Sequence, residues 1–390
     1  MKPVIIMKKI TYYFTTSLFL FICVAATAQS IYYPDTAWQS KTPQQAGMNP
    51  TKVDSAIAFA LRSENKVEKD LRIANLKSYA REPGYAINGP MKERGGPAGL
   101  VIKNGYIVAQ WGDVKRVDMT FSATKSYLST VAGLAVDDGL IRSVHDRVAN
   151  YVWDDSYTGQ HNSTITWEHL LNQSSDWSGS LFGLHDWADR PPREGGIDDW
   201  KNRKLQEPGT VFKYNDVRVN LLAYSLLQVY RKPLPVILKE RVMDPIGAST
   251  TWRWYGYDNT FVNIDGIMMQ SVSGGGHHGG GIFINTLDHA RFGLLFLRKG
   301  KWKGKQLLSE KWISEAHKPS TPNKEYGYMW WMNTTQKWKD VSPEVYYAAG
   351  FGGNYIVVDN EHDLVVVARW MDDSKMGEFM KMIISSIDKK

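Results

Sequence analysis

The chain has 390 residues, 43% of them hydrophobic and 22% charged, which is enough for a sizeable core in one large domain or two closely packed ones. The net charge of +7 comes from 47 Lys and Arg against 40 Asp and Glu. The basic residues are scattered and form no block of the kind that binds nucleic acid, so we expect no nucleic-acid partner. The 15 Trp and 20 Tyr fit either core packing or an aromatic-walled cleft for a small organic substrate.

The first 28 residues resemble a secretory signal peptide. A basic start at Lys2, Lys8 and Lys9 precedes an apolar run over residues 14–24, and an Ala-Thr-Ala sequence at 26–28 fits a cleavage site. We expect export to a bacterial periplasm. The one cysteine, Cys23, lies in this segment, and the bulky Ile22 before it argues against a lipoprotein anchor. The mature chain would then have no disulfide, thiol nucleophile or thiolate metal site.

The mature chain opens with a helical pattern at residues 53–61, followed by a charged, irregular stretch at 66–92. Two β-rich runs at 98–102 and 106–111 flank Asn104-Gly105, which is a hairpin signal.

About ten residues later stands Ser122-Ala123-Thr124-Lys125, at the head of an apolar run that predicts a helix ending near Gly139. Residues at i and i+3 of a helix lie on one face, about 5–6 Å apart at Cβ, so Ser122 and Lys125 can meet. A Ser hydroxyl is a weak nucleophile until a neighbouring base takes its proton. A buried Lys can act as that base, because desolvation disfavours its charged form. Taken alone, this four-residue pattern is a weak signal, since an N-cap Ser with a solvated Lys is the commoner arrangement.

From there to about residue 290 the sequence reads mostly as helix and loop. We expect helices at 165–171, capped by Thr166, at 219–230, at 235–242 and at 287–298. Residues 174–196 form a long loop of a kind that often walls a binding site, and there Trp177, Trp187 and Asp186 are either substrate contacts or loop-packing residues.

The last part returns to strands at 326–331, 346–349, 355–358 and 364–370, after a short helix at 311–317 and before a closing helix at 377–387. The pattern predicts an α/β (α+β) fold, in which an antiparallel sheet built from both termini is flanked by helices and carries a mostly helical inserted domain. We expect residues 29–121 and 291–390 in the sheet domain, residues 122–290 in the helical domain, and the active-site cleft between the two.

Two further segments supply groups that a Ser–Lys pair needs, namely a proton carrier and oxyanion donors. Tyr214 stands just before a predicted helix, in Tyr214-Asn215-Asp216, although a lone Tyr there is more often a packing residue. A glycine-rich stretch at 350–354 lies between two predicted strands, where it would let a substrate approach an edge strand, or would simply form a hairpin.

Together these segments resemble the three sequence boxes of the serine β-lactamase-like superfamily, especially its class C-like branch of family VIII esterases, 6-aminohexanoate-dimer hydrolases and penicillin-binding DD-peptidases. The boxes are Ser122 to Lys125, Tyr214 to Asp216, and Phe351-Gly352-Gly353 followed by Asn354. The resemblance runs from about residue 38 to the C-terminus. It implies a β-lactamase/transpeptidase-like fold, a Ser122 acyl-enzyme, and proton transfer by Lys125 and Tyr214. It also implies an oxyanion hole from the backbone N–H groups of Ser122 and Asn354, and no cofactor.

Two departures from the family pattern bear on the substrate and the mechanism. Asp216 replaces the usual Asn and would hold Lys125 protonated more firmly, which shifts the base role toward Tyr214. Phe351 stands where β-lactamases carry a Lys that binds the substrate carboxylate, so we expect less anionic substrates. Asp216, Phe351, Gly352 and Gly353 are predicted to line the substrate site.

Ser273 to Gly281 contains six Gly and the pair His277-His278. No carboxylate lies at a zinc-ligand spacing from these histidines in the sequence, so we expect no metal site. His277 is predicted to line the cleft, with a structural role as the alternative.

The sequence thus predicts an exported serine hydrolase of small ester or amide substrates. Two alternatives stay open: a DD-peptidase or weak β-lactamase, and a non-catalytic penicillin-binding-like protein that only binds a ligand. A Ser-His-Asp hydrolase would show a G-x-S-x-G turn, whereas Ser122 stands in Thr120-Phe121-Ser122-Ala123-Thr124.

Overall fold

The computed structural model describes residue 1 and residues 31–388, and the chain from Tyr32 onward forms one compact unit. Apart from Met1, the predicted signal segment lies outside the described residues. Among the described residues, no helix is both long enough and apolar enough to cross a membrane.

The main sheet joins the two ends of this unit, as the sequence predicts. Its six strands lie in the order β11-β12-β13-β14-β1-β2, and all neighbours are antiparallel. Leu100 pairs with Val367, so a strand from the start of the unit lies beside one from its end. The strands are β1 (Ala98–Lys103), β2 (Tyr106–Trp111), β11 (Trp331–Met332), β12 (Tyr346–Gly350), β13 (Asn354–Asp359) and β14 (Leu364–Arg369).

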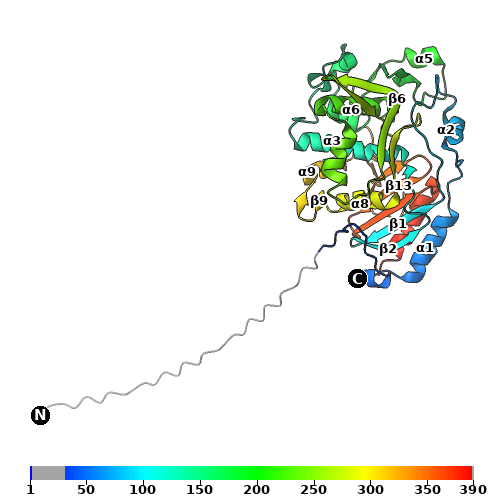
Figure 1. Ribbon diagram of the computed structural model, residues 1–390, viewed down its shortest axis with the longest axis vertical. Coiled ribbons are helices and arrows are strands. Elements are labelled where there is room, and N and C mark those ends of the chain that lie inside the picture. Colours follow the sequence, from blue (N-terminus) through cyan, green and yellow to red (C-terminus); the bar gives the residue numbers. More distant parts are fainter. Residues whose placement is uncertain (2–30, 389–390) are drawn as a thin grey trace. The chain divides into compact units, whose positions relative to one another are not determined.

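Helices cover both faces of this sheet (Figure 1). On one face α1 (Pro50–Arg62) packs against α10 (Met376–Ser385) and β2. Asn49 starts α1, because its side chain accepts a hydrogen bond from Lys52 N–H at 3.1 Å. On the other face α8 (Thr286–Leu297) lies across β13, β14 and β1, so the domain boundary predicted at residue 290 falls inside this helix.

The helical part is built around α3 (Thr124–Asp137), whose first twelve residues are all buried. This helix contacts α6 (Asp216–Tyr230), α7 (Leu234–Leu238) and α9 (Glu310–Ala316). Thr166 caps α4 (Trp167–Leu171) as predicted, accepting a hydrogen bond from His169 N–H. A π-helical segment (Lys239–Met243) extends α7, and the short α5 (Ile197–Lys201) follows the long loop.

A second, four-stranded sheet in the order β3-β8-β6-β7 was not predicted. Its strands are β3 (Asp118–Met119), β6 (Arg253–Ile264), β7 (Ile267–Val272) and β8 (Gly281–Ile284). Asp265 and Gly266 join β6 to β7 as a two-residue turn with φ of +54° and +83°. An Asp-Gly pair between apolar runs is a hairpin signal, so the sequence contained this information.

Two other expectations were wrong in detail. The stretch expected to be irregular contains α2 (Leu71–Tyr79), which Asp70 caps. The run at 326–331 is mostly a turn, in which Met329 has a φ of +63° and Gly327 N–H donates to the Trp330 carbonyl. The remaining short strands are β4 (Ser180–Leu181), β5 (Leu184–His185), β9 (Lys301–Trp302) and β10 (Lys305–Gln306).

Candidate active site

Ser122 lies in a one-turn 3₁₀ segment (Phe121–Ala123) that leads directly into α3. Phe121 has a φ of +48°, which costs a residue other than Gly about 1–3 kcal/mol and is held only where the surroundings require it. The rings of Phe351 and Trp370 contact Phe121 edge-on, with centroids 5.2 and 6.4 Å away. The turn leaves Ser122 half-buried between two buried neighbours.

Lys125 is enclosed, with 1% of its side chain surface exposed. Its Nζ donates to Ser122 Oγ at 2.8 Å and to the Gly274 carbonyl at 3.3 Å. The Ser–Lys pair that the sequence suggested is therefore in direct contact within one helical turn.

Asp216, at the first turn of α6, is the counterion of Lys125. Its Oδ1 lies 2.7 Å from Lys125 Nζ, although the geometry is that of an ion pair and not of a well-directed hydrogen bond. Burial acts to lower the pKa of Lys125, but the Asp216 carboxylate outweighs it and the pKa is raised. Burial acts to raise the pKa of Asp216, and the charges of Arg190 and Lys125 reverse this, so it lies well below its usual value. Both groups are charged in the resting site.

Tyr214 lies beside this pair. Its ring centroid is 5.0 Å from Lys125 Nζ and 5.3 Å from the guanidinium carbon of Arg190. Trp331 stacks against the same ring at 6.0 Å. Positive charge thus flanks Tyr214 next to an aromatic wall.

The end of β12 borders the turn that carries Ser122. A Cβ placed on Gly350 would overlap the Thr120 carbonyl oxygen and would lie 3.1 Å from the Ala123 nitrogen. Strand and nucleophile turn are therefore in backbone contact. Trp331 of β11 pairs with Tyr347, and the edge of β12 beyond that pair is open.

Hydrogen-bond directions along β12 show which N–H groups face this open edge. Asn333 N–H donates to the Val345 carbonyl at 2.9 Å, so Val345 faces β11. The N–H and C=O groups of successive residues in a strand point to alternate sides. Those of Ala349 therefore point to the same edge as those of Val345, and, if the alternation continues, so do those of Phe351. Gly350 faces the other way, because its carbonyl accepts from Gly353 N–H at 3.2 Å.

Asn354 is the register partner of Gly350, so its N–H points into the hairpin and away from Ser122. Its side chain is engaged as well, accepting from Arg369 Nε at 2.7 Å and donating to the Phe351 carbonyl at 2.8 Å. The geometry therefore does not favour Asn354 as an oxyanion donor.

Comparison with known proteins identifies the family. A family model described as Beta-lactamase matches residues 89–377. This chain belongs to the β-lactamase family.

Several solved structures share the fold at low sequence identity. A family VIII carboxylesterase is 16% identical with a TM-score of 0.55, covering 86% of this chain and 97% of its own. The hydrolase EstCE1, described as having promiscuous acyltransferase activity, is 15% identical with a TM-score of 0.55, covering 86% of this chain and all of its own (100%). A penicillin-binding protein homologue from Caulobacter crescentus is 13% identical with a TM-score of 0.54, covering 81% and 96%. No curated protein matches the sequence.

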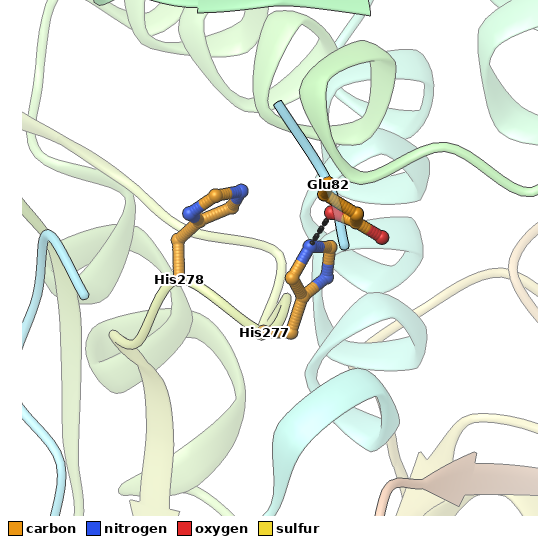
Figure 2. A group of neighbouring side chains, drawn as sticks. All are labelled: Glu82, His277 and His278. Carbon is orange, nitrogen blue, oxygen red and sulfur yellow. Dashed lines mark hydrogen bonds and ion pairs between the residues drawn. The ribbon is translucent and has the colours of Figure 1, made fainter. Parts of the chain in front are cut away.

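This β-lactamase-family site contains a buried ionic network that the sequence did not reveal. Arg190 lies between two carboxylates, 2.7 Å from Asp189 Oδ1 and 2.8 Å from Asp216 Oδ2, and Asp189 also accepts from Asp216 N–H. His277 lies 3.1 Å from Asp216 Oδ2. It also lies 2.5 Å from Glu82 Oε2, and this second contact is drawn in Figure 2. Arg190, Asp189 and Glu82 come from irregular segments without a motif, so only the fold could bring them together.

Glu82, His277 and His278 place donor atoms within 4.8 Å of one another, which is the kind of cluster that can hold a metal ion. The ring nitrogens of His277 are, however, already paired with Glu82 and Asp216. Arg190, whose backbone N–H donates to Glu82 Oε1 at 3.2 Å, adds a cation beside them. The cluster is therefore accounted for as an ion-paired network, and the absence of a metal site stays a prediction.

Phe351 packs between Phe121 and Tyr79, whose ring centroids lie 5.2 and 5.8 Å away. Gly352 and Gly353 have φ of +80° and +82°. A Cβ on Gly352 would press on the Trp370 ring, and one on Gly353 would overlap the Met371 carbonyl. These glycines are required by the tight hairpin beside the site.

Trp177 and Asp186 are engaged in the packing of the long loop. Trp177 is buried and donates to the Ser156 carbonyl at 2.7 Å. Asp186 is fully buried, with Oδ2 2.9 Å from Arg218 and 3.0 Å from Arg203. These contacts support the loop-packing alternative for both residues.

Proposed function

We propose that this chain is an exported serine hydrolase that cleaves small esters or amides through an acyl-enzyme on Ser122. The contact of a buried Lys125 with Ser122, next to the strained residue Phe121, is the observation that carries this proposal. Membership of the β-lactamase family supports the proposal, as do structural neighbours of this chain that are described as a hydrolase and a carboxylesterase.

In the first step Ser122 Oγ attacks the substrate carbonyl carbon and loses its proton, and the C–O or C–N bond to the leaving group then breaks. Because Asp216 holds Lys125 charged, we assign the uptake of this proton to Tyr214 acting as its phenolate, which becomes the neutral phenol, with Lys125 holding the oxygen of Ser122 in place. Tyr214 then returns the proton to the leaving alcohol or amine. Water attacks the acyl-enzyme by the same route in reverse and releases the acid.

The oxyanion that forms on the carbonyl oxygen needs backbone donors. We assign this role to the N–H of Ser122, in the first turn of a helix where N–H groups lack intrahelical acceptors, and to the N–H of Phe351 at the open edge of β12. Phe351 replaces Asn354 in this role, for the reasons of strand alternation given above.

Incubation of the protein with a fluorophosphonate tests the proposal, with the intact mass as readout. Ser122 Oγ would bond to phosphorus with loss of fluoride, giving a single adduct on the wild type and none on Ser122→Ala. Ser126→Ala is the matched control, because Ser126 is buried on the same helix and bonds the Met329 carbonyl instead. No adduct on folded wild type would contradict the proposal and favour the non-catalytic alternative.

Once the protein has been shown to react with the fluorophosphonate, the rates at which unlabelled protein hydrolyses short esters, amides and penicillins would separate the substrate classes. We expect turnover of uncharged esters or amides and little of penicillins, because the third box carries Phe351 instead of a cation. Efficient penicillin turnover would favour the β-lactamase or DD-peptidase alternative.

We propose in addition that residues 1–28 direct export to the periplasm and are removed there. N-terminal sequencing of the protein from the periplasmic fraction should begin at Gln29. A protein that retains residue 1 in the cytoplasmic fraction would contradict this.

A further inference from the structure

An unbroken series of contacts leads from Glu82 to the nucleophile. Glu82 Oε2 lies 2.5 Å from His277 Nε2, and His277 Nδ1 lies 3.1 Å from Asp216 Oδ2. Asp216 Oδ1 lies 2.7 Å from Lys125 Nζ, which donates to Ser122 Oγ at 2.8 Å. Glu82 and His277 belong to none of the three sequence boxes, yet this series of contacts links them through Asp216 to the reacting residues.

The two oxygens of Asp216 serve different partners. Oδ1 faces Lys125 alone, whereas Oδ2 is shared by Arg190 at 2.8 Å and His277 at 3.1 Å. A carboxylate shared among several cations attracts each less strongly, and a cation near a Lys favours loss of the Lys proton. The charge state of His277 therefore acts on Lys125 through Asp216.

His277 is enclosed by groups from several segments. Glu82 comes from the loop after α2, Asp216 from α6, and Arg190 and Asp189 from the loop before α5. The ring of Tyr79 stacks on His277 at 4.0 Å, and the rings of His278 and Tyr85 lie at 4.5 and 5.9 Å. Burial acts to lower the pKa of His277, and its hydrogen bonds to Asp216 and Glu82 outweigh this and raise it. Figure 2 shows the imidazole directed at the Glu82 carboxylate.

We propose that His277 and Glu82 are positioning residues for catalysis, which set through Asp216 how readily Lys125 gives up or shares its proton with Ser122 and Tyr214. A charged His277 partly neutralises the Asp216 carboxylate, so the carboxylate attracts the Lys125 ammonium less strongly. A neutral His277 leaves that charge to Lys125 and Arg190. Glu82 keeps His277 charged, so the pair adjusts the site to its working pH. This inference rests on the proposed function.

The rate of Ser122 phosphonylation, followed by intact mass from about pH 5.5 to about pH 9.5, tests it. His277→Asn keeps a donor near Nδ1 but removes the charge. We expect the rising limb of its curve of rate against pH to shift to higher pH by about one unit. At a fixed pH on that limb, the rate would be about tenfold lower than in the wild type. Above the pKa of His277 the two profiles should converge, because the wild-type imidazole is then neutral as well.

His278→Asn is the matched control, since it also removes a buried imidazole of the same loop, but its Nδ1 bonds the Ala86 carbonyl and not Asp216. Its profile should keep the wild-type shape. A purely structural role of His277 would lower the rate equally at every pH, and parallel profiles for His277→Asn would overturn the proposal.

Glu82→Gln supplies an independent readout that does not need His277→Asn to fold. NMR of the imidazole protons should show His277 titrating above the free-histidine range in the wild type, and at lower pH in Glu82→Gln. Equal titration in both proteins would contradict the proposal. A wild type that folds but is never phosphonylated would instead defeat the proposed function, so the two failures are distinguishable.

Discussion

Gly350 lies against Thr120 so closely that the strand and the nucleophile turn have no room for a side chain between them. Any atom added there must displace either the end of β12 or the backbone before Ser122. The position of the nucleophile is therefore fixed by the main sheet as well as by its own helix.

Gly350→Ala should lower the phosphonylation rate by about 100-fold, because displacements of about 1 Å at a reacting group have effects of that size. Gly96→Ala is the control, since a Cβ on Gly96 meets no atom within 4 Å and its φ is not positive. Rates should be compared with thermal unfolding of both variants. A Gly350→Ala protein that reacts like wild type would show that β12 does not fix Ser122.

Asp216→Asn would restore the usual residue of the family's second box and yet should harm this protein. It removes the shared counterion of Lys125, Arg190 and His277, and breaking a buried ion pair typically costs about 3–5 kcal/mol of unfolding free energy. Urea unfolding at neutral pH measures this loss. The same change should lower the pKa of Lys125. The rising limb of the curve of any surviving activity against pH should therefore lie at lower pH than in the wild type. A neutral effect on stability would contradict the network.

His277 should make the stability of the protein depend on pH in a defined direction. Its pKa is raised in the folded state, so its contribution is complete below the unfolded value of about 6.5 and is lost as pH rises through the folded value. His277→Asn should therefore lose more unfolding free energy near pH 5.5 than near about pH 9.5. Urea unfolding of both proteins at the two pH values gives the comparison, and a difference that is constant with pH would argue against a charged His277.

Asp186→Asn should destabilise the long loop without changing how substrate binds. It would leave Arg218 and Arg203 without one of their carboxylates in a buried setting. We expect a lower unfolding temperature and, below it, an unchanged KM. A raised KM in a stable protein would restore Asp186 as a substrate contact.

Treatment with EDTA should leave both the phosphonylation rate and the unfolding temperature unchanged, because the donors at Glu82 and His277 are engaged with each other. A loss that added Zn²⁺ restores in wild type but not in His278→Asn would show that Glu82, His277 and His278 bind a metal.

Local patterns in the sequence carried much of the architecture. The periodicity after Ser122 predicted α3, the Asn-Gly turn predicted the β1–β2 hairpin, and Thr166 was recognised as a helix cap, because each depends on neighbouring residues. The β6–β7 hairpin was missed although Asp265-Gly266 signals it, since aromatic-rich strands of mixed burial show no clean alternation.

The candidate site likewise has a part that the local sequence predicted and a part that it did not. Ser122 and Lys125 meet because one helical turn separates them, so their spacing was sufficient. The partners of Asp216 could not be predicted, because Glu82, Arg190 and His277 lie on three different loops that only the finished fold brings together. Asn354 was misjudged because the direction of a backbone N–H depends on strand register, which single residues do not encode.

The sharing of one carboxylate by Lys125, Arg190 and His277 also limits how this site can evolve. Replacing any one of these residues changes the balance of buried charge around Asp216, so we expect single steps to be costly and paired steps to be tolerated. Relatives with Asn at the position of Asp216 should therefore also lack the basic residues at the positions of Arg190 and His277. The ionic network would then be inherited or lost as a unit.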